Sequence, residues 1–231
     1  MTTLTKDWNR HVTHAEEIAR GPGFRDLRDR IIELAAPRPG EVAVDVGSGT
    51  GLLSLALAAH VDQVWAIDIS PSMADYLRTK AASAGLDNIQ AAVASAVSLP
   101  LVDESADLVV SNYCFHHVDE DDKRRALRET MRVLRPGGRL VFGDMMFDLA
   151  LGDLRNRAVI ADKVRAMLRK GPSGVMRLAK NGLRLAVGQW ERPATADWWR
   201  SALADEGFVD VHVTALDHEG GVATARRPLR Y

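Results

Sequence analysis

The 231-residue chain contains a single cysteine, Cys114, and so cannot form a disulfide bond within itself. No apolar run approaches the ~20 residues that a membrane-spanning helix needs, and the polar first residues lack the apolar core of a secretory signal. The formal net charge of −1 leaves no overall field that would attract nucleic acid or a membrane. These absences predict a cytoplasmic protein that keeps its one thiol reduced.

The residues that are present predict a single α/β domain. Apolar residues at 46% and charged residues at 26% are ordinary values for a globular chain. Short runs rich in β-branched residues alternate with stretches of helical spacing. Near-continuous apolar strands of this kind form parallel sheets that are covered on both faces. The expected strands are residues 42–46, 64–68, 89–93, 107–112 and 139–146.

The pattern changes after Phe147. Residues 151–188 carry no strand signal. A helix capped by Thr195 then precedes two strands, 208–215 and 221–227, which are separated by the turn-like sequence LDHEGG. The last part of the sequence is therefore expected to form a helix followed by a β-hairpin.

A glycine-rich turn follows the first expected strand. The strand ends near Asp45 and leads into Gly47-Ser48-Gly49-Thr50-Gly51, which is followed by a helix. Glycine allows positive φ and lets the main chain approach a ligand without a Cβ in between. Asp68 closes the next strand, where a carboxylate can accept both hydroxyls of a ribose that lies across the strand ends. The arrangement predicts a nucleotide-binding turn.

The glycine spacing and the position of Asp45 narrow the ligand. A dinucleotide fingerprint reads G-x-G-x-x-G, whereas the glycines here stand at 47, 49 and 51, and Leu52 takes the place of the third. A carboxylate at Asp45 would repel a pyrophosphate and attract an ammonium or sulfonium group. S-adenosylmethionine is a nucleoside with such a cationic tail and no phosphate. The alternative is a turn that serves only packing, with Asp45 as a cap.

Four segments of the chain together resemble a known family. They read VDVGSGTG, AIDIS, SLPLVDESADLVVSNYCFHHV and LRETMRVLRPGGRLVFGD. The sequence is similar to class I S-adenosylmethionine-dependent methyltransferases of the small-molecule type, which include the ubiquinone and menaquinone C-methyltransferases. The likeness covers residues 40–147 well and the terminal hairpin loosely. It implies a doubly wound, seven-stranded, mostly parallel α/β sheet of the Rossmann-like methyltransferase fold, with one antiparallel strand supplied by residues 208–226.

The resemblance assigns one set of residues to S-adenosyl-L-methionine and to its product, S-adenosyl-L-homocysteine. Asp45 and the main chain at Gly47 and Gly49 would hold the methionine end, Asp68 the ribose and Ile69 the adenine ring. The complete cofactor set is Asp45, Gly47, Ser48, Gly49, Gly51, Asp68, Ile69, Ser95, Ala96 and Asn112.

Ser95 departs from the family pattern. The family places an acid there, followed by a small residue, and the acid binds the adenine amino group. This chain has Ser95 and Ala96. A serine hydroxyl accepts the same hydrogen bond less strongly than a carboxylate, and Ala96 still offers its N–H to the ring. The departure predicts weaker cofactor binding rather than a different cofactor.

The methyl acceptor is expected beyond the fourth strand, at residues 111–120. Methyl transfer from a sulfonium is an in-line displacement, so the site must align the acceptor, exclude water and remove an acceptor proton where there is one. The adjacent His116 and His117 are candidate general bases. The alternative is that one ring packs under the next helix. The candidate substrate contacts are Tyr113, Met145, Met146 and Trp8.

Cys114 lies in the same segment. It has no assembled partner for nucleophilic chemistry, and it is expected to be a small buried hydrophobic residue. No metal site is predicted. The resemblance does not require a base, because proximity and orientation suffice for many acceptors.

The segment 155–184 is strongly basic. It holds nine Lys or Arg residues and one acid, Asp162. Apolar residues at helical spacing predict two amphipathic helices hinged at residues 171–174 and inserted after the fifth strand as a lid over the acceptor side. Three uses stay open: attraction of an anionic acceptor, transient contact with an anionic membrane, or a solvated face. Nucleic acid is not an expected partner, because no aromatic residues are interleaved with the charges.

The chain is thus expected to be one methyltransferase domain. Its parts are a helical flap at 1–35, a cofactor-binding core at 40–147, the basic lid at 148–192, and a helix with a β-hairpin at 193–231. The expected activity moves a methyl group from S-adenosylmethionine to an O, C or N atom of a small, partly apolar organic molecule. Two alternatives stay open, a catalytically silent S-adenosylmethionine-binding regulatory protein and an NAD-dependent oxidoreductase.

Overall fold

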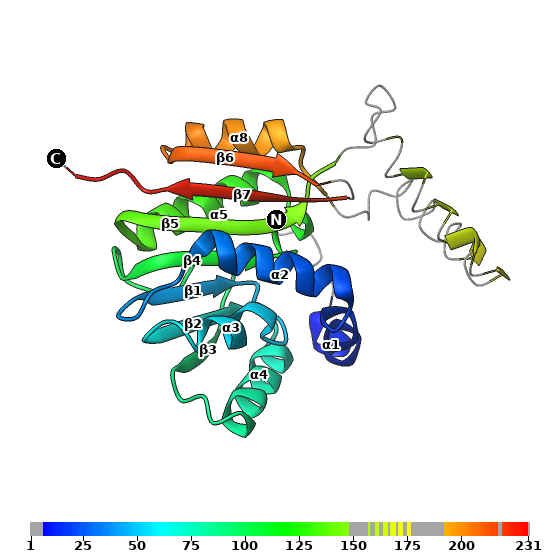
Figure 1. The fold of residues 1–231 in the computed structure, drawn as a ribbon, viewed down its shortest axis with the longest axis horizontal. Coiled ribbons are helices and arrows are strands. Elements are labelled where there is room, and N and C mark those ends of the chain that lie inside the picture. The colour runs from blue at the N-terminus through cyan, green and yellow to red at the C-terminus, as the bar shows by residue number, and fades with distance from the viewer. Residues whose placement is uncertain are drawn as a thin grey trace.

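A seven-stranded sheet runs through the molecule in the order β3-β2-β1-β4-β5-β7-β6 (Figure 1). This computed structural model describes residues 7–147, 192–216 and 219–230, and between them residues 157, 160, 161, 164, 165, 167–169, 171, 172, 175 and 176. The strands are β1 (Val42–Val46), β2 (Gln63–Asp68), β3 (Ile89–Val93), β4 (Ala106–Asn112), β5 (Leu134–Met145), β6 (Val209–Ala215) and β7 (Gly220–Arg226).

The direction of the strands confirms the expected topology. Strands β1 to β5 pair in parallel, whereas β7 lies between β5 and β6 and is antiparallel to both. The sheet is therefore mostly parallel with one antiparallel strand. The helices are η1 (Trp8–His11), α1 (Val12–Ala19), α2 (Pro22–Ala35), α3 (Leu52–Leu57), α4 (Pro71–Ser83), η2 (Phe115–His117), α5 (Glu120–Val133) and α8 (Ala196–Asp205).

Helices cover both faces of the sheet, and each face has its own apolar core. On one face, α2 and α3 bury Ile31 and Leu57 completely against the strands. On the other face, α5 and α8 bury Leu127 and Trp199. Figure 1 shows α2 in front of the sheet and α5 behind it. Because both faces are covered, the central strands are apolar along nearly their whole length, and this pattern made them predictable.

Strand β5 begins at Leu134 rather than at residue 139 as predicted. Helix α5 ends at Val133, and the next residue already pairs with Ala106 of β4. The register then shifts before Leu108 pairs with Arg139. Pro136 has no N–H to donate and fits the irregular start of a strand. A Pro-Gly sequence predicts a turn, and here it lies inside this irregularity, where Gly137 has φ of 79° and residues 135–138 have no partner in β4.

The predicted start of the last helix is confirmed. The Thr195 side chain accepts a hydrogen bond from the backbone N–H of Trp198 at 3.1 Å, which satisfies one of the unpaired donors in the first helical turn. The helix then leads into the β6–β7 hairpin, as expected.

Most of the predicted lid lies outside the described residues, including 148–156 and 177–191. Described residues between 157 and 168 are helical, as their spacing predicts. The chain turns at Gly171, whose φ is 66° and whose N–H donates to the carbonyl of Leu168 at 3.0 Å. The place of this segment over the acceptor side stays a prediction. In the described part of the chain, no helix is long and apolar enough to cross a membrane.

Candidate active site

The glycine-rich turn closes over the carboxyl end of β2. The backbone N–H groups of Gly47 and Ser48 both donate to the carbonyl of Ile67, at 2.8 and 3.0 Å. Gly47, with φ of 72°, also lies against the segment that follows β4, since a Cβ at this position would sit 2.4 Å from Cys114 Sγ. A bare main chain is thus required at the point where β1, β2 and β4 meet.

Asp68 braces this turn. One carboxylate oxygen accepts from the N–H of Gly49 and the other from the N–H of Ser70, both at 2.8 Å. Burial raises the pKa of the Asp68 carboxyl. The neighbouring Ile69 is 46% exposed, which is unusual for an isoleucine and leaves an apolar surface beside the carboxylate. That these two residues hold the ribose and the adenine stays a prediction.

Asp45 is buried near the end of β1. Its carboxylate is 1% exposed and accepts a hydrogen bond of 2.6 Å from the Ser54 hydroxyl of α3. Burial raises the pKa of this carboxyl to about 7. In the structure Asp45 therefore fastens β1 to the helix after the turn.

Two buried polar atoms at the site have no hydrogen-bond partner within the described residues. They are Ser48 Oγ in the turn and Asn112 Oδ1 at the end of β4. Away from the site, Trp199 Nε1 in the core also has no partner among the described residues. Buried polar groups are nearly always paired in native proteins, with protein, water or ligand. Ser48 Oγ and Asn112 Oδ1 are therefore available to a polar ligand at the strand ends.

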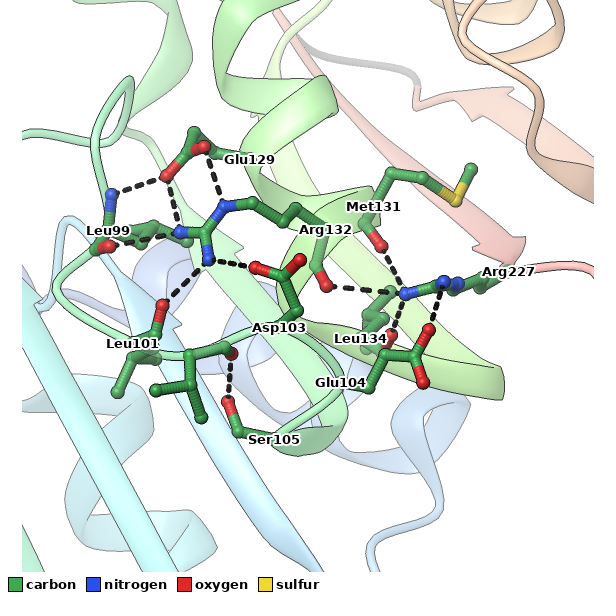
Figure 2. A network of polar contacts seen from close by, with 11 residues as sticks. Leu99, Leu101, Asp103, Glu104, Ser105, Glu129, Met131, Arg132, Leu134 and Arg227 are labelled. Atoms are coloured by element: carbon green, nitrogen blue, oxygen red, sulfur yellow. Dashed lines mark hydrogen bonds and ion pairs between the residues drawn. The ribbon is translucent and has the colours of Figure 1, made fainter.

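The loop 94–105, which carries Ser95 and Ala96, is held from α5 and from the end of β7. Arg132 of α5 donates to two carbonyls of the loop and pairs with Glu129, and this guanidinium holds the pKa of Glu129 below its usual range (Figure 2). Arg227 donates to carbonyls at the junction of α5 and β5 and pairs with Glu104 of the loop (Figure 2). Arg132 and Arg227 thus hold the loop that is expected to contact the adenine.

An apolar cluster stands at the ends of β4 and β5. Tyr113 has φ of 52° and packs with the buried Met145 and Phe147. Its ring lies 4.7 Å from that of Phe24 of α2, and burial raises the pKa of its hydroxyl. Met146 is not part of this cluster, because its side chain alternates to the other face and enters the main core.

His116 forms a buried pair with Asp144 of β5. Its Nδ1 lies 2.5 Å from Asp144 Oδ1, and the exposed fractions of the two side chains are 5% and 1%. The backbone N–H of His116 donates to the other carboxylate oxygen at 3.0 Å, and the N–H of Met145 donates to Oδ1 at 2.7 Å. The first of the two predicted histidines is therefore fixed in orientation by a carboxylate.

The N-terminal flap reaches both sides of the site. Asn9 accepts hydrogen bonds from the Ser70 hydroxyl at 2.7 Å and from the N–H of Ser72 at 3.2 Å. The Trp8 ring lies 4.6 Å from the ring of His117. The structure thereby brings Trp8 and His117 together and ties the flap to the turn after Asp68.

Comparison with known proteins identifies the centre of the chain. Residues 44–142, which run from β1 to β5, match the family model described as a methyltransferase domain. Residues 44–142 are therefore similar to a methyltransferase domain, and they make up less than half of the chain. The glycine turn, Asp68 and the end of β4 all lie within the matched residues.

Curated relatives match about half of the chain. The chain is 42% identical over 113 residues to the malonyl-[acyl-carrier protein] O-methyltransferase of Methylococcus capsulatus, which covers 48% of this chain and 39% of that protein. It is 36% identical over 124 residues to the ubiquinone/menaquinone biosynthesis C-methyltransferase of Vibrio vulnificus, which covers 51% and 47%. The chain thus spans about half or less of the length of these relatives.

Solved structures share the fold over nearly the whole chain. An S-adenosylmethionine-dependent methyltransferase from Aquifex aeolicus has a TM-score of 0.66 at 19% identity and covers 94% of this chain and 98% of its own. A putative S-adenosylmethionine-dependent methyltransferase from Methanococcus maripaludis has a TM-score of 0.67 at 24% identity, with 100% and 99% covered. These likenesses concern the fold.

Cys114 is half-buried rather than fully buried as expected. Burial raises the pKa of its thiol, so the reactive thiolate is disfavoured. No group of three or more His, Cys, Asp or Glu side chains that could hold a metal ion occurs in the described part of the chain.

The sequence reasoning missed Asp144 and Lys123. Asp144 interrupts the apolar end of β5, and a lone acid in such a run was the available signal. Lys123 lies on α5 among charged residues that resemble a solvated face, yet it is 1% exposed. Its Nζ donates to the carbonyls of Val118 and Arg192, at 2.5 and 2.7 Å. Lys123 thereby ties α5 to the chain that returns at residue 192.

The buried Lys123 should make stability depend on pH. Burial lowers its pKa to about 8, whereas an unfolded lysine has a pKa near 10.4. The unfolded state therefore binds more protons between these values, and stability rises with pH across that window. We expect the free energy of unfolding, measured in urea, to gain roughly 2 kcal/mol from this group between pH 8 and pH 10. Lys123→Met should remove that increment, and an equal pH dependence in both proteins would contradict it.

Proposed function

We propose that the protein transfers a methyl group from S-adenosylmethionine to a small, partly apolar organic molecule. One observation carries the proposal: the turn 47–51 is braced by Asp68, and beside it the buried oxygens of Ser48 and Asn112 have no partner among the described residues. A ligand with polar groups at the strand ends would satisfy both atoms.

The chain's own residues suit the two halves of the cofactor. Asp68 has lone pairs left for ribose hydroxyls after accepting from Gly49 and Ser70. Ile69 offers its exposed apolar surface to the adenine, and the loop with Ser95 and Ala96 lies at the next strand end. The bound cofactor would supply an electrophilic methyl group on sulfur. Its binding site would thus be assembled from the ends of β1, β2, β3 and β4.

The acceptor is proposed to lie against the apolar cluster at the ends of β4 and β5. Tyr113 and Met145 would align it and exclude water, which is the main requirement of an in-line displacement. Trp8 and His117 would cover it from the N-terminal side. The relatives named above are an O-methyltransferase and a C-methyltransferase, so both kinds of acceptor suit this domain. Contact of the basic segment with an anionic membrane stays a prediction.

Calorimetric titration followed by an activity assay tests this function. S-adenosylmethionine and S-adenosylhomocysteine should bind, whereas NADH should not, because the turn lacks the glycine spacing that receives a pyrophosphate. Labelled methyl groups should then move to an apolar acceptor. Absence of binding at millimolar concentrations of both ligands would overturn the proposal. Binding without transfer to any acceptor would instead favour a regulatory protein.

The pH dependence of cofactor affinity should report on Asp45. Its pKa is about 7 in the free protein, and a nearby cationic group would lower that value. Binding would then release a proton, so affinity should rise about tenfold between pH 6 and pH 8. Asp45→Asn should lack this component, and comparison with it removes the titration of the cofactor itself. Identical pH profiles in the wild-type protein and Asp45→Asn would contradict the contact between Asp45 and the cofactor. Asp121→Asn, which changes an exposed carboxylate, serves as the control and should keep the wild-type profile.

A further inference from the structure

The Asp144 carboxylate is surrounded by three donors, of which two belong to His116. The backbone N–H groups of His116 and Met145 donate to its two oxygens, and His116 Nδ1 contacts Oδ1 at 2.5 Å. The bond from the His116 N–H already fixes the segment 115–117 against β5, and the bond from the Met145 N–H lies within β5. The contact with the imidazole ring is therefore additional to what the fold needs, and its effect is on the ring.

This contact decides which ring nitrogen carries the proton. An ionised carboxylate can only accept hydrogen bonds, so in the neutral imidazole the proton resides on Nδ1. Nε2 is then left with its lone pair and can accept a proton. A carboxylate that orients a histidine in this way also stabilises the imidazolium that forms when the histidine acts as a base.

The ring stands beside the proposed acceptor site. His116 follows the end of β4, and its ring lies 6.0 Å from that of Tyr113, at 83° to it. Tyr113 in turn packs with Met145 and Phe147. The ring of His117 lies 3.8 Å away on another side. An acceptor held by this apolar cluster would thus meet a histidine whose orientation is fixed.

We propose that Asp144 is a positioning residue that holds His116 as the proton acceptor for methylation of a hydroxyl group. In the step, the acceptor oxygen forms a bond to the methyl carbon while the methyl–sulfur bond breaks. The electron pair of the broken bond stays on sulfur. The hydroxyl proton passes to His116 Nε2, so a sulfonium and an alcohol or phenol give a thioether, a methyl ether and an imidazolium. This inference rests on the proposed function.

A hydroxyl acceptor gains most from such a base. A neutral amine attacks through its lone pair and can lose its proton to water afterwards, and a thiol reacts as the thiolate, which forms near neutral pH. An alcohol or phenol becomes strongly acidic only as the new bond forms, so removal of its proton in the transition state lowers the barrier. The pair therefore points to an apolar alcohol or phenol as substrate.

Several other charged or titratable groups lie around this pair. Tyr113, Cys114 and Lys123 interact electrostatically with Asp144. The ring of His117 and the backbone N–H of Arg192 contact His116. Further out, Glu120, Asp119 and Arg192 act on Lys123, and Glu219 acts on Tyr113. Lys123 is the cation among the groups that interact electrostatically with Asp144. A pH profile must therefore be measured in Lys123→Met as well.

The tautomer can be measured without any substrate. In the ¹⁵N-labelled full chain with S-adenosylhomocysteine, ¹H–¹⁵N correlations of the imidazoles should show His116 with Nδ1 protonated and Nε2 bare in its neutral form. Loss of these signals in His116→Gln assigns them. In Asp144→Asn, neutral His116 should show a mixture of the Nδ1-protonated and Nε2-protonated tautomers. A neutral His116 protonated on Nε2 in the wild-type protein would overturn the proposal.

Turnover provides the second test, with 4-propylphenol, 4-propylaniline and 4-propylbenzenethiol as probes on one apolar scaffold. The phenol should be methylated, and His116→Gln should lower its kcat about 10²–10⁴-fold with little change in S-adenosylhomocysteine affinity. Asp144→Asn should lower kcat and shift the acidic limb of the kcat profile to lower pH, because the imidazolium loses its carboxylate. A merely structural Asp144 would change stability and leave that limb in place.

Other outcomes separate the two proposals. Methylation of the amine or thiol alone, or an unshifted acidic limb in Asp144→Asn, would overturn the role of the pair and leave methyl transfer intact. Failure to bind S-adenosylhomocysteine would refute the proposed function, while the tautomer of His116 would still be decided by the spectrum.

Discussion

Gly47→Ala is expected to prevent cofactor binding and to lower the melting temperature by roughly 6–12 °C. The φ of 72° costs an alanine about 1–2 kcal/mol. The new Cβ would also lie 2.4 Å from Cys114 Sγ and 2.6 Å from Cys114 Cβ, and overlap of this kind costs about 1–3 kcal/mol. The turn would be pushed away from the segment after β4, and with it the N–H groups that face the ligand.

Two variants separate the sources of this effect. Gly40 has φ of 85° with nothing within 4 Å of an added Cβ, so Gly40→Ala carries the backbone cost without the overlap. It should lower the melting temperature less and leave cofactor affinity unchanged. Adding Cys114→Gly to Gly47→Ala removes the atoms that overlap and should restore part of both losses. If Gly47→Ala kept the melting temperature and the cofactor affinity of the wild-type protein, the close approach of Gly47 to Cys114 would not be needed.

Asp68→Ala should weaken cofactor binding by more than one lost hydrogen bond would. A charge-assisted bond to the ribose contributes about 1.5–3 kcal/mol, which is roughly 10- to 150-fold in affinity. In addition, the N–H groups of Gly49 and Ser70 would both lose their acceptor, and the turn would lose its brace. Calorimetry with S-adenosylhomocysteine should therefore show a loss at or beyond the upper end of that range.

Asp68→Asn is the matched comparison. Its amide keeps one acceptor oxygen and nearly the same shape but no charge, so its affinity should fall between those of Asp68→Ala and the wild-type protein. Asp121→Asn, an exposed change on α5, should alter nothing. Equal affinities in the alanine and asparagine variants would mean that the carboxylate acts by shape rather than by hydrogen bonding.

The features predicted correctly from the sequence are those set by local patterns. The apolar runs of β1 to β4, the glycines after β1 and the cap at Thr195 depend on neighbouring residues only, so their spacing was sufficient. The start of β5 was misplaced because pairing with β4 acts across the register shift near Leu108. Local chemistry at Pro136 could not show that pairing.

The pair of His116 and Asp144 shows the other limit. The two residues are 28 positions apart and meet because β4 and β5 are neighbours that end at the same edge of the sheet. Sequence reasoning placed His116 among the candidate bases but had no means of choosing its partner or its tautomer. Met146 illustrates the same point, since only the alternation at the end of β5 separates it from Met145.

The position of β7 has a consequence for synthesis of the chain. It is inserted between β5 and β6, yet residues 220–226 are made after both. Until they emerge from the ribosome, β5 presents an open row of N–H and C=O groups on one side. Such an edge can pair with another nascent chain. If the parallel half of the sheet forms during synthesis, its β5 edge stays exposed to aggregation until residues 220–226 pair with it.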